Sequence, residues 1–205
     1  MLLKNKNVVI TGCKSGLGKY LYECLPDSFG LTRQNSEHFF KQKHDIDLII
    51  HCAFNTKSND KFQLLQDNII LTKKLCELKP KKFVYISTVD VYNDEITNYN
   101  LLKMFAESMV TNMCDNSLIL RCSAMLGSNM RKNNFLKIVE DQTPKLSLTS
   151  DSTLNLVLHS DIKKIILKAF EKNISGFYDV VSKDNITLKQ IANFFDKNCS
   201  FGKYK

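Results

Sequence analysis

The sequence lacks several features that would place it in other classes of protein. No apolar run approaches the roughly 20 residues of a membrane-spanning helix, so no membrane association is predicted. The chain starts MLLKNKNVVI and enters a strand-like run at once, so we expect no signal peptide. It contains no internal repeat, low-complexity segment or linker. These absences predict a single domain that spans residues 1–205.

The cysteines also lack a pattern. Seven of them are scattered along the chain without a CxxC pair. A zinc site or a nucleophilic cysteine would need a spacing that the sequence does not show. We interpret the odd number of cysteines as reduced thiols of a cytoplasmic protein, and we predict no metal site.

The formal net charge is +8, which raises the question of nucleic acid. The lysines are spread over the whole chain, and their densest cluster is KPKK at 79–82, before a strand-like run. This spread favours a solvated basic surface and predicts no nucleic-acid partner. A basic surface could also attract an anionic small-molecule substrate.

Strand-like and helix-like runs alternate along the chain. Apolar strand-like runs lie at 7–12, 29–33, 47–53, 82–88, 117–123 and 176–182. Helix-like stretches lie near 17–26, 35–42, 60–78, 99–114, 160–172 and 187–197. Strands that are apolar along most of their length have both faces covered, so the alternation predicts an α/β fold with a doubly wound parallel sheet. The one long irregular stretch, 127–157, contains the possible short helix NNFLKIVE.

The stretch TGCKSGLG at 11–18 joins the first strand-like run to the first helix. Such a turn presents free backbone N–H groups and the positive end of a helix dipole to a ligand. Gly12 permits the tight turn, Gly16 lets a pyrophosphate approach the backbone, and Gly18 lets the helix pack close to the sheet. A merely tight turn is the alternative, and a mononucleotide P-loop is disfavoured because no Gly-Lys-Ser/Thr follows. The predicted cofactor-binding residues in this turn are Gly12, Lys14, Ser15, Gly16, Leu17 and Gly18.

Together with this turn, seven later segments resemble the extended, nucleotide-sugar branch of the short-chain dehydrogenase/reductase superfamily, the NAD-dependent epimerases and dehydratases. They are DLIIHCA, LLQDNIILTKKL, FVYISTVDVY, YNLLK, LILRCSAMLG, LVLHSDIKKIILKAF and GFYDVVSKDNITLKQIANFF. The resemblance implies a Rossmann-type fold that binds NAD(P), with further cofactor contacts from Cys52, Ala53, Asn68, Ser87 and Lys103. The substrate half is abbreviated relative to that branch, so we expect a small C-terminal substrate lobe built from about 127–157 and 176–205.

The YNLLK segment carries the predicted acid-base pair. Lys103 lies four residues after Tyr99 and therefore on the same helix face. A nearby ammonium favours a phenolate, so we expect Lys103 to lower the pKa of Tyr99 from its usual value of about 10. Tyr99 could then exchange a proton with a substrate oxygen. The resemblance implies that Thr88 hydrogen-bonds that oxygen, with Ser87 as the alternate, and that Lys103 also contacts the nicotinamide ribose. An ordinary surface helix pair is the alternative.

Arg33 ends the second strand-like run, where NAD-preferring relatives place an acid that binds the ribose hydroxyls. An arginine there can pair with a 2′-phosphate, so we predict NADP(H), with NAD as the alternative. Arg33 could instead stack on the adenine or face water.

The resemblance implies oxidation or reduction at a sugar carbon, with a nucleotide sugar as the expected substrate. A 4-keto reductase or an epimerase fits best, and Val89 at an acidic position of the dehydratase motif disfavours dehydration. A dinucleotide-binding regulator or scaffold without turnover is the hypothesis from another class. Two histidines, His51 and His159, are interpreted as structural. A homodimer through the helices at 60–78 and 99–114 is plausible by the same resemblance.

Overall fold

Six parallel strands form the central sheet of the protein, whose computed structural model describes residues 3–4 and 6–204. The strand order is β2-β1-β3-β4-β5-β9. Their bounds are Val8–Thr11 (β1), Phe29–Leu31 (β2), Leu48–His51 (β3), Phe83–Thr88 (β4), Ser117–Cys122 (β5) and Gly176–Val180 (β9). Each lies within a predicted strand-like run, so the predicted doubly wound α/β fold is confirmed.

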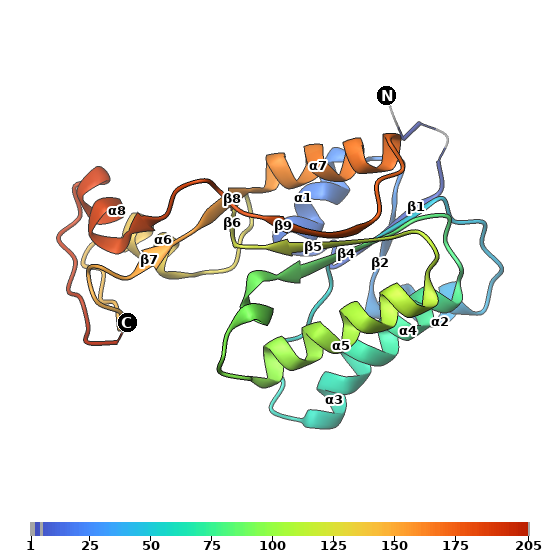
Figure 1. The fold of residues 1–205 in the computed structure, drawn as a ribbon, viewed down its shortest axis with the longest axis horizontal. Coiled ribbons are helices and arrows are strands. Elements are labelled where there is room, and N and C mark those ends of the chain that lie inside the picture. The colour runs from blue at the N-terminus through green and yellow to red at the C-terminus, as the bar shows by residue number, and fades with distance from the viewer. Residues whose placement is uncertain (1–2, 5, 205) are drawn as a thin grey trace.

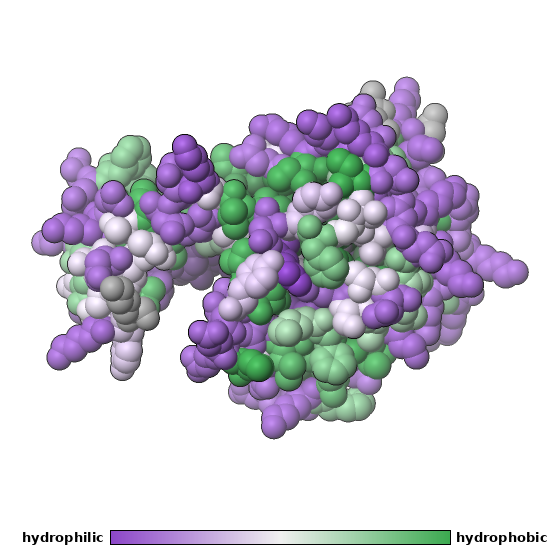
Figure 2. Space-filling view, in the orientation of Figure 1, coloured by the Kyte–Doolittle hydropathy of each residue, from purple (hydrophilic) through white to green (hydrophobic). Residues whose placement is uncertain are grey.

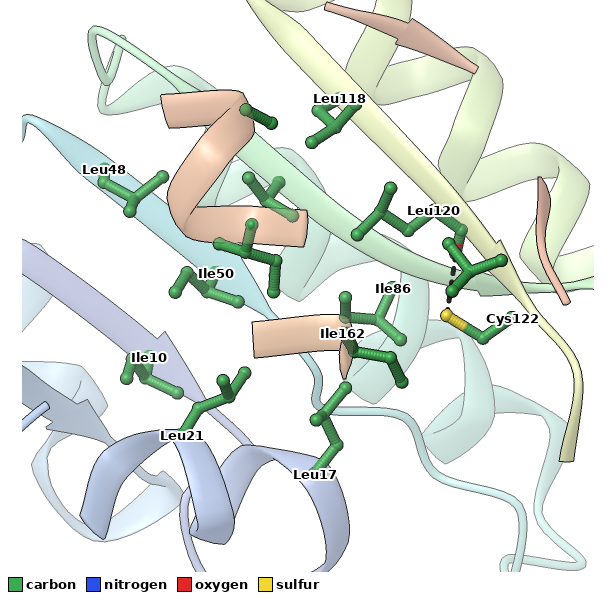
Figure 3. Close-up of a cluster of buried hydrophobic side chains, with 14 of the residues drawn as sticks. Ile10, Leu17, Leu21, Leu48, Ile50, Ile86, Leu118, Leu120, Cys122 and Ile162 are labelled. Atoms are coloured by element: carbon green, nitrogen blue, oxygen red, sulfur yellow. Dashed lines mark hydrogen bonds between the residues drawn. The ribbon is translucent and has the colours of Figure 1, made fainter. Parts of the chain in front are cut away.

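Helices cover both faces of this sheet (Figure 1). One face carries α1 (Gly16–Cys24) and α7 (His159–Glu171), and Figure 3 shows Leu21 and Ile162 of these helices over strand residues such as Ile50 and Leu120. The other face carries α2 (Arg33–Phe40), α4 (Leu71–Glu77) and α5 (Asn98–Met113), which bury a second apolar cluster against the sheet. The apolar strands are therefore covered on both faces, as their composition requires.

The predicted helix at 60–78 is not a single regular α-helix. It consists of α3 (Lys61–Leu65), a π-helical turn at Gln66–Ile70 and α4. A π-helical turn accommodates one extra residue per turn and often occurs at a functional site. Here it places Asn68, which is only 1% exposed, behind the carboxyl end of β3.

A small lobe lies at one end of the sheet, beyond β5 and β9 (Figure 1). It contains β6 (Ala124–Leu126) paired with β8 (Leu156–Leu158), and β7 (Thr153–Leu154) paired with β10 (Ile186–Thr187). The helices α6 (Asn134–Glu140) and α8 (Leu188–Phe194) pack on each other around Ile138 and Ile191. The predicted lobe segment at 176–205 begins too early. Its first residues form β9, which pairs with β5 along its whole length and belongs to the central sheet.

A buried ion pair attaches α5 to the sheet. The Arg121 guanidinium on β5 donates to the Glu107 carboxylate on α5, with a shortest distance of 2.7 Å, and Ser87 on β4 donates to the same carboxylate. Because Glu107 is held by two strands, the rotation of α5 is fixed, and so is the face that carries Tyr99 and Lys103. In the described part of the chain, no helix has the length and apolar character needed to cross a bilayer.

Candidate functional site

A cleft of about 1590 Å³ lies at the carboxyl ends of β1, β3, β4 and β5. The chain reverses its winding direction between β1 and β3, and ligands of open α/β sheets bind beside such a point. The cleft brings together nearly all of the predicted site residues. Those that line it are Gly12, Lys14, Ser15, Gly16, Leu17, Gly18, Arg33, Cys52, Ala53, Ser87, Thr88, Tyr99 and Lys103.

Two glycines of the first turn are required by close packing. A Cβ on Gly12, which has φ +71°, would lie 2.9 Å from the backbone nitrogen of Ala53. A Cβ on Gly18 would lie 2.4 Å from the carbonyl oxygen of Gly12. Gly16 has φ +55°, and a Cβ there would meet nothing within 4 Å, although its N–H donates to the Asn129 carbonyl at 2.9 Å. Turns of this kind between a strand and a helix can bind phosphate groups.

Thr11 joins this turn to the end of β3. Its hydroxyl oxygen accepts N–H bonds from Cys52 (3.1 Å) and Ala53 (3.0 Å), so its proton points to Nδ1 of His51, 2.6 Å away. The opposite ring nitrogen of His51 then donates to the Thr72 hydroxyl at 2.9 Å. Burial lowers the pKa of His51 to about 3, so this histidine is neutral and positions the 52–53 backbone.

Asn68 supports the same loop from behind. Its side-chain oxygen accepts the Asn55 backbone N–H at 2.7 Å, and its amide donates to the Asn55 carbonyl at 3.0 Å. Asn68 was expected to contact the cofactor, but its side chain bonds to backbone and does not line the cleft. The structure therefore gives Asn68 a positioning role for the loop that follows β3.

The predicted acid-base residues lie together in the cleft. Tyr99 hydrogen-bonds Thr88, whose hydroxyl also accepts the Asp90 N–H at 3.1 Å. The Lys103 ammonium is buried and donates to the Ile86 carbonyl at 2.8 Å. Burial lowers the pKa of Lys103 to about 7.

The expected direction of the Tyr99 pKa shift is wrong. Burial raises the pKa of Tyr99, the hydrogen bond with Thr88 opposes this effect, and the Asp90 carboxylate adds to it. Lys103 does not offset the burial, because its ammonium is directed to the Ile86 carbonyl and is itself destabilised by desolvation. Tyr99 therefore carries its proton at neutral pH.

Two residues that were not predicted also border the reactive pair. The Phe54 ring lies edge-on to Tyr99, with 5.3 Å between ring centroids, and Nζ of Lys103 lies 4.2 Å from the Phe54 centroid. Arg131 reaches across the cleft and donates to the Phe54 carbonyl at 3.1 Å. Phe54 directly follows the predicted contact residues Cys52 and Ala53. Because ligands of open α/β sheets bind beyond the carboxyl ends of the strands, Phe54 could have been predicted from the sequence as well. Arg131 lies in an irregular stretch and gave no such signal.

Two basic side chains, Arg33 and Lys14, line the end of the cleft beside β2; we call this end the mouth. Arg33 donates to Asp67 at 2.6 Å while its side chain stays 78% exposed, and Asn55 donates to the same carboxylate oxygen at 2.7 Å. Lys14 donates to the side chain of Gln34 at 2.7 Å. Two exposed cations can therefore meet a phosphate at this end of the cleft.

Near the lobe, the cleft is lined by two residues with unsatisfied atoms. Among the described residues, the buried atoms Oγ of Ser123 and Nδ1 of His159 have no hydrogen-bond partner. Burial lowers the pKa of His159, so its ring is neutral at pH 7. The ring packs close to Gly127, where an added Cβ would lie 2.2 Å from Nδ1. The structural role of His159 stays a prediction.

A sequence profile described as the NAD dependent epimerase/dehydratase family matches residues 8–146. The chain belongs to the NAD-dependent epimerase/dehydratase family. A comparison with curated protein sequences found no match to this chain.

Solved structures of nucleotide-sugar enzymes share the fold of this epimerase/dehydratase family member. UDP-glucuronic acid 4-epimerase from Bacillus cereus, in complex with UDP-glucuronic acid and NAD, is 20% identical with a TM-score of 0.79, over 97% of this chain and 86% of that chain. dTDP-4-dehydrorhamnose reductase from Bacillus anthracis, in complex with NADP, is 21% identical with a TM-score of 0.79, over 96% and 83%. The Yersinia enterocolitica reductase of the same name is 21% identical with a TM-score of 0.77, over 97% and 83%. At these identities, the likeness establishes the fold.

The neutral state of His51 predicts a specific loss of stability in acid. Between pH 6.5 and pH 3 the unfolded chain takes up a proton at His51 that the folded protein does not, so stability falls as the pH falls through this range. We expect this residue to account for a loss on the order of 4 kcal/mol at pH 3. Denaturant unfolding of the wild type and of His51→Asn across this range measures it. The variant should show a flatter pH dependence, and parallel curves would contradict the assignment.

Proposed function

We propose that the protein is an NADP(H)-dependent oxidoreductase that acts on a carbon of a nucleotide-linked sugar, as a 4-keto reductase or an epimerase. The observation that carries the proposal is the single cleft that joins the glycine turn to Thr88, Tyr99 and Lys103. The solved relatives support the substrate class, since their names specify UDP- and dTDP-linked sugars.

In this mechanism Tyr99 is the acid-base group. A bound nicotinamide would supply or accept the hydride. Because its pKa is raised, Tyr99 holds a proton that it can donate to the oxygen of a substrate carbonyl as the hydride adds to the carbon. Thr88, which hydrogen-bonds Tyr99, would orient the same substrate oxygen. Reduction needs Tyr99 to donate a proton, whereas epimerisation begins with proton removal by the same residue.

Lys103 would bind the cofactor in its charged form. Burial lowers the pKa of Lys103 to about 7, and a hydroxyl group of a ribose would give the ammonium a polar neighbour that favours the charged form. Buried between Tyr85 and Phe54, the ammonium has few other polar groups to contact. The pair thus needs a ligand to complete its hydrogen bonding.

The exposed cations at the mouth support NADP(H) over NAD(H). Arg33 is paired with Asp67 but is 78% exposed, so its remaining N–H groups can reach a 2′-phosphate. Lys14 lines the same end of the cleft and adds a second positive charge.

We also propose a homodimer through the outer surface of α3 and α5. Phe62 and Leu65 on α3 and Leu101, Met104 and Phe105 on α5 are all exposed. The α5 residues lie three and four positions apart and form one stripe, and Figure 2 shows apolar side chains on the face that carries these helices. A second copy of the chain is the occupant that covers such a stripe symmetrically.

Arg33→Ala tests the cofactor preference. We expect about tenfold weaker NADPH binding, because one charge-assisted interaction is lost. NADH binding should be unchanged, because NADH has no 2′-phosphate. Fluorescence titration of each nucleotide measures both affinities. Lys41→Ala removes an exposed cation outside the cleft and is the matched control. Equal losses for the two nucleotides would mean that Arg33 does not recognise the 2′-phosphate.

Tyr99→Phe tests catalysis. With a panel of 4-keto nucleotide sugars and NADPH, we expect kcat to fall by about 100-fold or more while NADPH still binds. Tyr178→Phe, which alters an exposed phenol outside the cleft, should keep the wild-type rate. If the wild type binds NADPH but turns over no member of the panel, the alternative of a dinucleotide-binding regulator or scaffold is favoured.

Phe105→Glu tests the dimer. Phe105 is 60% exposed, so a charge there should leave the fold intact but should repel its copy across a two-fold interface. Sedimentation equilibrium should give a dimer for the wild type and for Phe194→Glu on α8, and a monomer for Phe105→Glu. A wild type that sediments as a monomer would refute this interface.

A further inference from the structure

The reacting pair is covered by the protein's own Phe54 side chain. Nζ of Lys103 lies between two aromatic rings, 4.2 Å from the centroid of Phe54 and 4.9 Å from that of Tyr85. Tyr85 is buried within β4, whereas Phe54 is partly exposed and lines the cleft. Phe54 and Lys103 both line the cleft, and the Phe54 ring borders Nζ of Lys103 there.

We propose that Phe54 is a gate that controls access of the nicotinamide half of the dinucleotide to Tyr99 and Lys103. This inference rests on the proposed function, because it assumes that a dinucleotide binds in the cleft. A ribose that contacts Nζ of Lys103 from the cleft would compete with the Phe54 ring for this ammonium. The ring must move away before the nicotinamide half can settle.

Two hydrogen bonds from Arg131 hold the loop that carries Phe54 beside Lys103. Arg131 donates to the Phe54 carbonyl at 3.1 Å and to the Thr56 hydroxyl at 3.2 Å. Both acceptors are neutral groups of the 54–56 segment, and this segment and Arg131 all line the cleft. Arg131 thus links the gate to the segment at 127–131.

The same segment covers the diphosphate end of the cleft. The carbonyl of Asn129 accepts the Gly16 N–H at 2.9 Å, and the Asn129 side chain accepts from Lys19 at 3.1 Å. Asn129 has φ +62°, a left-handed conformation that is uncommon for a residue other than glycine. Two donors that would meet a dinucleotide, the Gly16 N–H and the Lys103 ammonium, are therefore both engaged by the protein itself.

The two ends of the ligand should meet different resistance. The adenosine end reaches Lys14 and Arg33 at the mouth without contacting Phe54. The nicotinamide end has to displace the Phe54 ring and its contact with Lys103. A fragment that contains only the adenosine end consequently distinguishes the gate from the rest of the site.

Phe54→Ala tests the gate, with Phe194→Ala as the control for loss of an exposed phenyl ring elsewhere. Calorimetric titration should show that Phe54→Ala binds NADPH about fivefold more tightly than the wild type, as expected when a cation–π contact no longer competes. Adenosine 2′,5′-bisphosphate should bind the wild type and both variants equally. If the wild type binds NADPH and Phe54→Ala binds it no more tightly, the gate is refuted while the proposed function stands.

Labelling of the ligand-free proteins provides a readout that needs no nucleotide. Under acetic anhydride at alkaline pH, Lys103 should be acetylated faster in Phe54→Ala than in the wild type, with Lys57 as the internal reference for an exposed amine. Peptide mass spectrometry measures both rates, and an unchanged rate at Lys103 would refute the gate. If no nucleotide binds any of the proteins, the proposed function fails, and the labelling rate alone decides whether Phe54 covers Lys103.

Discussion

The hydroxyl of Thr11 is the interaction on which the site depends. It accepts two backbone N–H groups at the end of β3 and donates to His51, so it fastens the turn after β1 to the loop after β3. This arrangement requires an acceptor at Nδ1 of His51, which a neutral imidazole provides and an imidazolium cannot. It also brings the backbone so close that Gly12 cannot carry a side chain. The cleft lies at the carboxyl ends of β1 and β3, where the winding direction of the sheet reverses.

The second constraint is the anchoring of α5. A carboxylate as buried as Glu107 is costly unless it is fully paired, and here Arg121 and Ser87 supply donors from two neighbouring strands. Rotation of α5 would break these bonds. Tyr99 and Lys103, which lie eight and four residues before Glu107, are consequently held at fixed depth beside Thr88. The same depth desolvates them and shifts both pKa values toward the neutral forms.

The sequence was sufficient for features that depend on local pattern. Apolar runs and the three glycines of the first turn predicted the sheet, its helices and the position of the cleft. Features that arise from contacts between distant segments were missed: the π-helical turn that holds Asn68, the pairing of β6 with β8, and the reach of Arg131 to Phe54. The sign of the Tyr99 shift belongs to the same group, because helix spacing places Lys103 near Tyr99 but does not show that its ammonium turns to Ile86.

The opposite pKa shifts of the two residues have one physical origin and one chemical consequence. Burial opposes charge on either side chain, so it raises the pKa of the Tyr99 phenol and lowers that of the Lys103 ammonium. A dinucleotide brings negative phosphates and ribose hydroxyls, which favour the ammonium form of Lys103. Binding would then restore the positive charge beside Tyr99 that helical spacing predicts, and would lower the cost of the phenolate left after proton donation. If Phe54 acts as the proposed gate, its displacement by a dinucleotide would therefore change the charge beside Tyr99 as well as access to it.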